Sequence, residues 1–155
     1  MRPTKEQWED AKQQFDWTGS INLRCDGYLV EIRLLQKKMR LFVGVLVNGS
    51  IKREYFWHGH ERDRSEIPDI ARRFFRIKKQ RLPAKKVAEY ERLVGKKECK
   101  RRGVYDTYLY ADSIFLSFGA CIKHIQSENA SIEILERDSF MAALAAIPEV
   151  PDAAQ

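Results

Sequence analysis

The residues best suited to metal chemistry are two histidines and two carboxylates that lie close together in the chain. His58 and His60 flank one glycine, and Glu61 and Asp63 follow, so all four lie within six residues. In an extended segment, side chains two residues apart point to the same side, and His58 and His60 could therefore bind one metal ion. A zinc site usually needs a third protein ligand, and the third histidine, His124, is distant in the chain. The alternative interpretation is a polar loop after a strand, and we expect no metal or other cofactor.

A block of positive charge is the strongest functional signal. Residues 72–102 contain 14 basic and 3 acidic side chains, whereas residues 1–71 carry a net charge of +1 and residues 103–155 a net charge of −6. Clustered lysine and arginine side chains favour polyanionic partners, while an ordinary solvated helix face usually mixes both signs. We therefore predict that the chain binds nucleic acid, or a protein complex that carries nucleic acid. The candidate binding residues are Arg72, Arg73, Arg76, Lys78, Lys79, Lys85, Arg92, Lys96, Lys97, Lys100, Arg101 and Arg102.

Aromatic residues near this block could stack on bases. Phe74 falls on the apolar side of a predicted helix, so packing in the core is the preferred interpretation, and Phe75 lies at the edge of that side. Tyr105, Tyr108 and Tyr110 follow the block. They could stack on a base, anchor a protein interface or close a sheet, and these alternatives stay open.

Motifs for nucleophilic catalysis and for phosphate cradling are not found. The chain contains no GxSxG, no recognisable pairing of cysteine with histidine and no glycine-rich phosphate loop. We therefore expect a protein that is not an enzyme. A metal-dependent nuclease that uses residues 58–63 beside the basic block is the alternative.

The elements that must position these residues begin with a helix and a run of strands. Thr4 and Gln7 have the spacing of a capping box, which predicts a helix over residues 5–15. Period-two patterns and the turn dipeptides Asp26-Gly27 and Asn48-Gly49 then predict four strands between residues 20 and 57. Short connections between consecutive strands favour an antiparallel meander.

Helical patterns dominate the second half of the chain. One predicted helix begins near residue 66 and directs Arg72, Arg73 and Arg76 to solvent. Pro83 opens a second, with Ala84, Val87, Tyr90 and Val94 as its buried stripe and Gly95 at its end. A basic loop is predicted over residues 96–103. The short, aromatic stretch at residues 104–110 could form a fifth strand or an extended segment.

The chain then closes with further helices. Asp112 is the predicted N-cap of a helix that runs to about residue 127. A strand over residues 131–135 and a short helix up to residue 144 follow. The predicted fold is α+β: a four-stranded antiparallel β-meander with an N-terminal helix and three or four helices packed on it.

Length and composition set the remaining expectations. A chain of 155 residues predicts a single domain over residues 1–147 and a mobile C-terminal tail over residues 148–155. No stretch resembles a membrane span or a signal peptide, so we expect a cytoplasmic protein that does not contact membranes. Cys25, Cys99 and Cys121 are odd in number and form no CxxC pair, which predicts free thiols, with Cys121 in the core and Cys99 at the surface.

Four stretches resemble a group of small accessory proteins encoded by phages and prophages of proteobacteria. They are MRPTKEQW at the start, RCDGY at residues 24–28, LVGKK at residues 93–97 and SIEIL at residues 131–135. The resemblance implies a role on DNA in recombination, replication or regulation, or inhibition of a host defence complex such as a CRISPR effector. The protein would then act in the host cytoplasm.

The two implied roles need different surfaces. An inhibitor of a CRISPR-type complex could act mainly by protein–protein contact, and this is our alternative function. A decoy that imitates DNA would be acidic, whereas the basic block is suited to guide RNA, bound DNA or an acidic protein surface.

Overall fold

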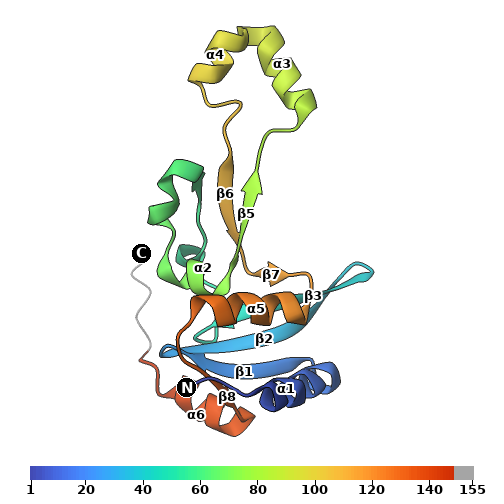
Figure 1. The fold of residues 1–155 in the computed structure, drawn as a ribbon, viewed down its shortest axis with the longest axis vertical. Helices are drawn as coiled ribbons and strands as arrows, with labels where there is room; N and C mark the ends of the chain where they lie inside the picture. Colours follow the sequence, from blue (N-terminus) through green and yellow to red (C-terminus); the bar gives the residue numbers. More distant parts are fainter. Residues whose placement is uncertain (149–155) are drawn as a thin grey trace.

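The computed structural model describes residues 1–148, and the predicted tail therefore lies, apart from Pro148, outside the described residues. The fold is α+β with two antiparallel sheets and several helices (Figure 1). The larger sheet has the strand order β7 (Ile114–Phe115), β3 (Arg40–Val47), β2 (Tyr28–Lys37), β1 (Ser20–Cys25) and β8 (Ile132–Leu135). The smaller sheet has the order β4 (His58–His60), β6 (Tyr108–Asp112) and β5 (Arg76–Gln80).

Helices and short 3-10 segments connect these strands. The helices are α1 (Lys5–Thr18), α2 (Asp69–Phe74), α3 (Ala84–Val94), α4 (Lys96–Arg101), α5 (Phe118–Glu128) and α6 (Arg137–Ala145). The 3-10 segments are η1 (Arg53–Tyr55) and η2 (Glu61–Glu66). Within residues 1–148, no helix has both the length and the apolar character needed to cross a membrane.

Local signals account for the first half of the fold. The Thr4 and Gln7 side chains form the predicted capping box at the start of α1. Asp26-Gly27 and Asn48-Gly49 both adopt positive φ angles, as tight hairpin turns require, and β1, β2 and β3 form the predicted meander.

The predicted fourth strand, residues 50–57, is wrong. After an isolated bridge between Val47 and Ser50 the chain leaves the sheet, and β7 pairs with β3 instead. The ring of Phe56 stacks on Phe75 with centroids 5.1 Å apart, and Tyr55 is buried. Tyr55 and one face of the Phe56 ring are therefore covered by tertiary packing rather than by a strand pair, and Ile51 stays exposed. The period-two pattern cannot distinguish these outcomes.

Three predicted boundaries in the second half are also wrong. The first predicted helix ends at Phe74, because the chain from Arg76 onward pairs with β6 as strand β5. Asp112 belongs to β6 and accepts a hydrogen bond from the Ile114 N–H at 3.0 Å, while Ser117 caps α5. The predicted basic loop at residues 96–103 contains helix α4. The strand predicted over residues 131–135 is confirmed as β8.

The main core lies on one face of the larger sheet. Inward side chains of β1, β2 and β3 pack against α1, α2 and α5, and Phe74 and Phe75 are fully buried among them, as predicted for Phe74. On the opposite face, α6 covers Leu29 and Leu135 with Phe140. All three cysteines are free; Cys121 is buried as predicted, but Cys99 is buried as well, so its predicted surface position is wrong.

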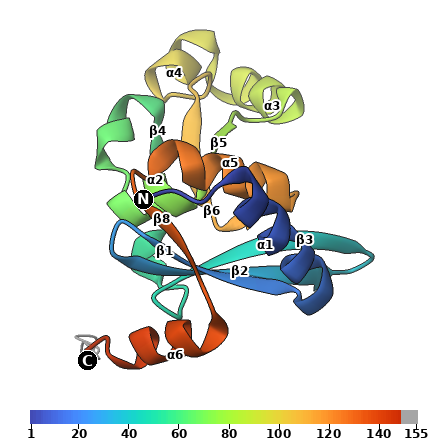
Figure 2. The same cartoon turned by 60° about the horizontal axis from the view of Figure 1, so that its bottom comes forward.

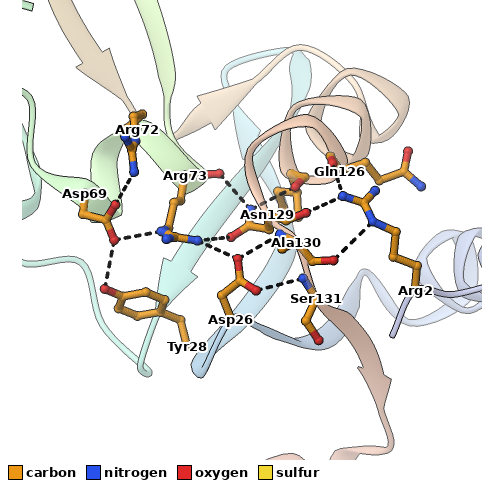
Figure 3. Close-up of polar contacts among 11 residues, drawn as sticks. Arg2, Asp26, Tyr28, Asp69, Arg72, Arg73, Gln126, Asn129, Ala130 and Ser131 are labelled. Carbon is orange, nitrogen blue, oxygen red and sulfur yellow. Dashed lines mark hydrogen bonds and ion pairs between the residues drawn. The ribbon is translucent and has the colours of Figure 1, made fainter.

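A polar network ties α2 to two turns of the larger sheet (Figure 3). The guanidinium of Arg73 donates to Asp26 Oδ2 at 2.6 Å and to Asp69 Oδ2 at 2.8 Å, and its side chain is only 23% exposed. Asp26 also accepts hydrogen bonds from the backbone N–H groups of Ala130 and Ser131 at 2.9 and 2.8 Å. The β1–β2 turn, α2 and the α5–β8 connection therefore share one arginine.

The titration of the two carboxylates follows from this geometry. Backbone hydrogen bonds from Ala130 and Ser131, together with Arg73, lower the pKa of Asp26. Burial acts to raise the pKa of Asp69, but the hydrogen bond and charge of Arg73 keep it below its usual value. A carboxylate with a lowered pKa in the folded state stabilises the fold above its unfolded pKa, and this contribution is lost as the pH falls through the folded value.

We expect Asp26→Asn to lower the free energy of unfolding by about 1–3 kcal/mol at pH 7, because two backbone donors and Arg73 lose their ionised partner. The difference in stability between wild type and variant should shrink as the pH falls below about 4, the usual pKa of an aspartate, and should disappear only below the lowered pKa of Asp26 in the fold. Urea unfolding over a pH series from 7 to 2 measures both effects. Glu133→Gln, which removes an exposed pair with Arg24, is the control and should change stability by less than about 1 kcal/mol. An equal loss in both variants would contradict the role of Asp26.

Candidate nucleic-acid interface

Most of the basic block lies on a projection that we call the arm, residues 76–112, which comprises β5, α3, α4 and β6. Strands β5 and β6 pair from Arg76 opposite Asp112 to Gln80 opposite Tyr108, and β4 pairs with the other side of β6. Figure 1 shows these strands leading away from the larger sheet, with α3 and α4 at the far end, and Figure 2 shows the same separation after rotation. The cations of the two helices therefore lie on the part of the molecule most remote from its core.

The end of the arm has little core of its own. Gly95 separates α3 from α4 with φ 84° and ψ 161°, a conformation that is essentially restricted to glycine. No residue of α3 is buried, so the predicted buried stripe of Ala84, Val87, Tyr90 and Val94 is wrong. That stripe was inferred from helical spacing, but the helix projects away from the layers that could have covered it.

A few contacts hold the two helices to the returning chain. Cys99 of α4 is fully buried, and its carbonyl accepts a hydrogen bond from the Val104 N–H at 3.0 Å. The Tyr105 hydroxyl donates to Glu91 Oε1 at 2.9 Å, which links the returning segment to α3. Desolvation and the Glu91 carboxylate raise the pKa of Tyr105 to about 12, so this donor keeps its proton at neutral pH.

At the base of the arm, four of the five predicted binding residues have acidic partners within the chain, and Arg76 is the exception among residues 1–148. Arg72 pairs with Asp69 at 2.5 Å and Arg73 belongs to the network in Figure 3. Arg76 lies on β5 rather than on α2, so the predicted free helix face of Arg72, Arg73 and Arg76 does not exist. Two lysines of β5 also have acidic partners: Lys78 pairs with Asp112 at 3.0 Å, and Lys79 with Glu61 at 3.3 Å.

At the end of the arm, more of the predicted cations lack an acidic partner than have one. Arg101 and Arg102 share Glu98, and their hydrogen bonds lower the pKa of Glu98 to about 2. The other predicted cations are exposed and form no ion pair with any acidic residue in the part of the chain that the structure describes. We call this set the unpaired cations: Lys85, Arg92, Lys96, Lys97 and Lys100.

Two basic residues of the arm were not among the predicted binding residues. Lys86 lies on α3 and pairs with Glu89 at 3.5 Å, and Arg81 lies between β5 and α3. Arg81 Nε donates to the Thr107 hydroxyl at 2.7 Å, and a hydroxyl carries no charge. The positive charge of Arg81 therefore has no acidic partner among residues 1–148. Membership of the basic block was the signal that could have identified both.

The two histidines of β4 are not equivalent. His60 Nδ1 accepts a hydrogen bond from the Arg62 N–H at 3.0 Å, which assigns the proton of a neutral ring to Nε2, and Nε2 donates to Asp106 Oδ2 at 2.9 Å. Both ring nitrogens of His60 are therefore engaged. His58 is exposed, and its ring lies nearly parallel to that of Tyr108, with centroids 6.1 Å apart. No group of three or more metal-ligating side chains is found among residues 1–148.

The tyrosines after the basic block fall on different parts of the arm. Tyr108 and Tyr110 belong to β6, the middle strand of the smaller sheet, and Tyr105 precedes it. The Lys78 ammonium lies 5.7 Å from the centroid of the Tyr110 ring. Comparison with known proteins adds nothing to this geometry: no family model, curated protein or solved structure matches the chain.

We expect one equivalent of Zn²⁺ to leave the ring signals of His60 unchanged, because both nitrogens already have partners. Long-range ¹H–¹⁵N correlation spectra measure this, with His60→Ala identifying the signals and EDTA as the reversal. Saturable shifts of His58 and His60 together would contradict the assignment and support a shared metal.

Proposed function

We propose that this chain is a non-enzymatic protein that binds nucleic acid, alone or within a larger complex, through the end of its arm. The observation that carries the proposal is the separation of charge along the arm. Four of the five predicted cations at the base have acidic partners, and Arg76 is the exception within residues 1–148. At the end of the arm Arg101 and Arg102 share Glu98, whereas the five unpaired cations, Lys85, Arg92, Lys96, Lys97 and Lys100, have no acidic partner in the described chain.

The physical basis is the release of counterions. Each lysine or arginine that contacts a phosphate releases counterions from the nucleic acid, and affinity then falls as salt rises. A cation that already pairs with a carboxylate gains less, because the existing pair must be broken. The end of the arm is therefore the surface where a polyanion gains most.

The projection of the arm also favours this role. Lysine and arginine at the end of an extended segment reach into a partner without bringing α5, β8 and α6 close to it (Figure 1). Residues 113–148, which contain these elements, hold four acidic and two basic side chains, and a polyanion gains nothing from approaching them.

We expect Lys96→Glu/Lys97→Glu/Lys100→Glu to abolish binding of labelled DNA and RNA, measured by fluorescence anisotropy at low salt. For wild type, log K against log salt should have a slope of about −3 to −5, in line with three to five phosphate contacts. The control is Lys37→Glu/Lys38→Glu/Arg40→Glu, which makes the same change of charge at exposed positions of the β2–β3 turn.

The outcomes distinguish an effect of charge at the end of the arm from an effect of the net charge of the protein. Retained binding in the control supports the arm as the interface. Equal loss in both variants would show a general charge effect, and failure of wild type to bind either nucleic acid at low salt would exclude direct binding.

We expect Glu98→Gln to strengthen binding a few-fold and to make the salt dependence steeper by up to about one charge, because Arg101 and Arg102 lose their shared acidic partner. Glu98 is ionised at neutral pH, since its pKa is about 2. Glu9→Gln makes the same change of net charge on α1, where Glu9 lies 4.0 Å from Lys5, and is the matched control. Equal strengthening by both variants would contradict an interface at the arm.

A further inference from the structure

A hollow opens on the side of the arm between α3, β4 and the returning chain. Its volume is about 510 Å³, within the range of small-molecule binding sites. Three aromatic side chains, two arginines and one glutamine contribute to its wall, with apolar residues between them. We call it the arm pocket, and the polar and aromatic residues that line it are His58, Tyr90, Tyr108, Arg81, Arg102 and Gln80.

One wall of the arm pocket presents aromatic rings in a fixed orientation. The planes of His58 and Tyr108 lie within 9° of each other, and the edge of His60 supports Tyr108 with centroids 5.4 Å apart. The Tyr108 hydroxyl donates to the Gly103 carbonyl at 3.4 Å, and an added Cβ at Gly103 would lie 3.0 Å from that hydroxyl oxygen. The ring of Tyr108 is therefore held by neighbours, while the exposed His58 ring and Tyr90 remain accessible.

The arm pocket also contains positive charge, which comes from two arginines. Arg81 uses Nε to bind the Thr107 hydroxyl at 2.7 Å, and its two terminal nitrogens form no hydrogen bond within residues 1–148. Arg102 uses Nε to bind Glu98 at 2.7 Å and lines the same hollow. A guanidinium oriented through Nε retains its paired terminal N–H groups, which match the geometry of a phosphate.

We propose that the arm pocket binds one unpaired nucleotide of a single strand, with its base against the His58 and Tyr108 rings and its phosphate at Arg81. Stacking on aromatic side chains is the common way in which proteins hold unpaired bases, and it is tolerant of sequence. This inference rests on the proposed function and deepens it, because a duplex keeps its bases stacked and would contact only the unpaired cations.

The choice of occupant follows from the combination of groups. A phosphate alone would need the arginines but not the flat aromatic wall, and an apolar ligand would leave the charge of Arg81 without a partner. A nucleotide uses both. The strand that carries it can continue toward Lys96, Lys97 and Lys100, because the pocket residue Arg102 follows α4 directly.

The experiment compares three labelled DNA probes of 12 nucleotides per strand: a single strand, an abasic single strand with the same number of phosphates, and a duplex, which has twice as many. Anisotropy titrations at low salt give each affinity. We expect Tyr108→Leu and, separately, His58→Ala to weaken binding of the normal single strand roughly tenfold, in line with the loss of one base stack. Affinity for the abasic strand and the duplex should change less than twofold.

Two further variants sharpen the test. Tyr108→Phe keeps the ring and should retain the affinity of wild type, which separates stacking from the hydroxyl. Arg81→Gln should weaken binding of the normal and abasic strands alike, since both carry phosphates. Thermal unfolding of each variant verifies its fold, and His58→Ala serves where Tyr108→Leu does not fold, because His58 is exposed.

Several results would overturn the proposal. If Tyr108→Leu or His58→Ala weakens binding of all three probes equally, the effect is electrostatic or structural. If neither variant changes any affinity, the pocket does not take part in binding. Displacement of the strand by adenosine monophosphate at equal concentration would assign the pocket to free nucleotides instead. One result would separate the two proposals. If wild type binds the duplex, Lys96→Glu/Lys97→Glu/Lys100→Glu abolishes that binding, and the pocket variants bind every probe as wild type does, the proposed function stands and the proposed nucleotide site is rejected.

Discussion

The arrangement of this molecule depends on one ion-pair network, the contacts of Arg73 with Asp26 and Asp69. Three segments that are distant in the chain meet at this guanidinium: the β1–β2 turn, α2 and, through Asp26, the connection from α5 to β8. Arg73 immediately precedes the buried Phe74 and Phe75, and β5 begins at Arg76. The same few residues therefore anchor α2 to the core and set the direction in which the arm leaves it.

Ion pairs also divide the basic block by environment. A charged group that is partly removed from water needs a partner, and Arg73 and Lys78 obtain theirs from Asp26, Asp69 and Asp112. Arg72 and Lys79 are more exposed but also lie beside carboxylates, those of Asp69 and Glu61. Cations at the end of the arm remain hydrated and need none. A stretch that looks uniform in the sequence is thus structural at its base and open to a polyanion at its end.

Sequence patterns predicted the elements whose causes are local. Asp26-Gly27 and Asn48-Gly49 predicted their turns because the backbone conformation depends on those residues themselves, and Thr4 with Gln7 predicted the start of α1 for the same reason. Of the smaller sheet, only β6 was anticipated, since a strand was one interpretation of residues 104–110. Strands β4 and β5 were missed, because they are short and pair across long separations in the chain. Helical spacing in α3 predicted a buried stripe, but burial depends on where the helix lies, and α3 lies on the arm.

The sequence alone determined the α+β class, the first three strands, the burial of Phe74 and the concentration of positive charge between residues 72 and 102. These follow from composition, period and turn chemistry, which act over a few residues. Only the tertiary structure decided which cations have partners, that both nitrogens of His60 are engaged and that His58, Tyr108 and Arg81 line one hollow. The reason is physical: ion pairs, buried hydrogen bonds and pockets arise between segments far apart in the chain, and their formation depends on the positions that packing gives to those segments.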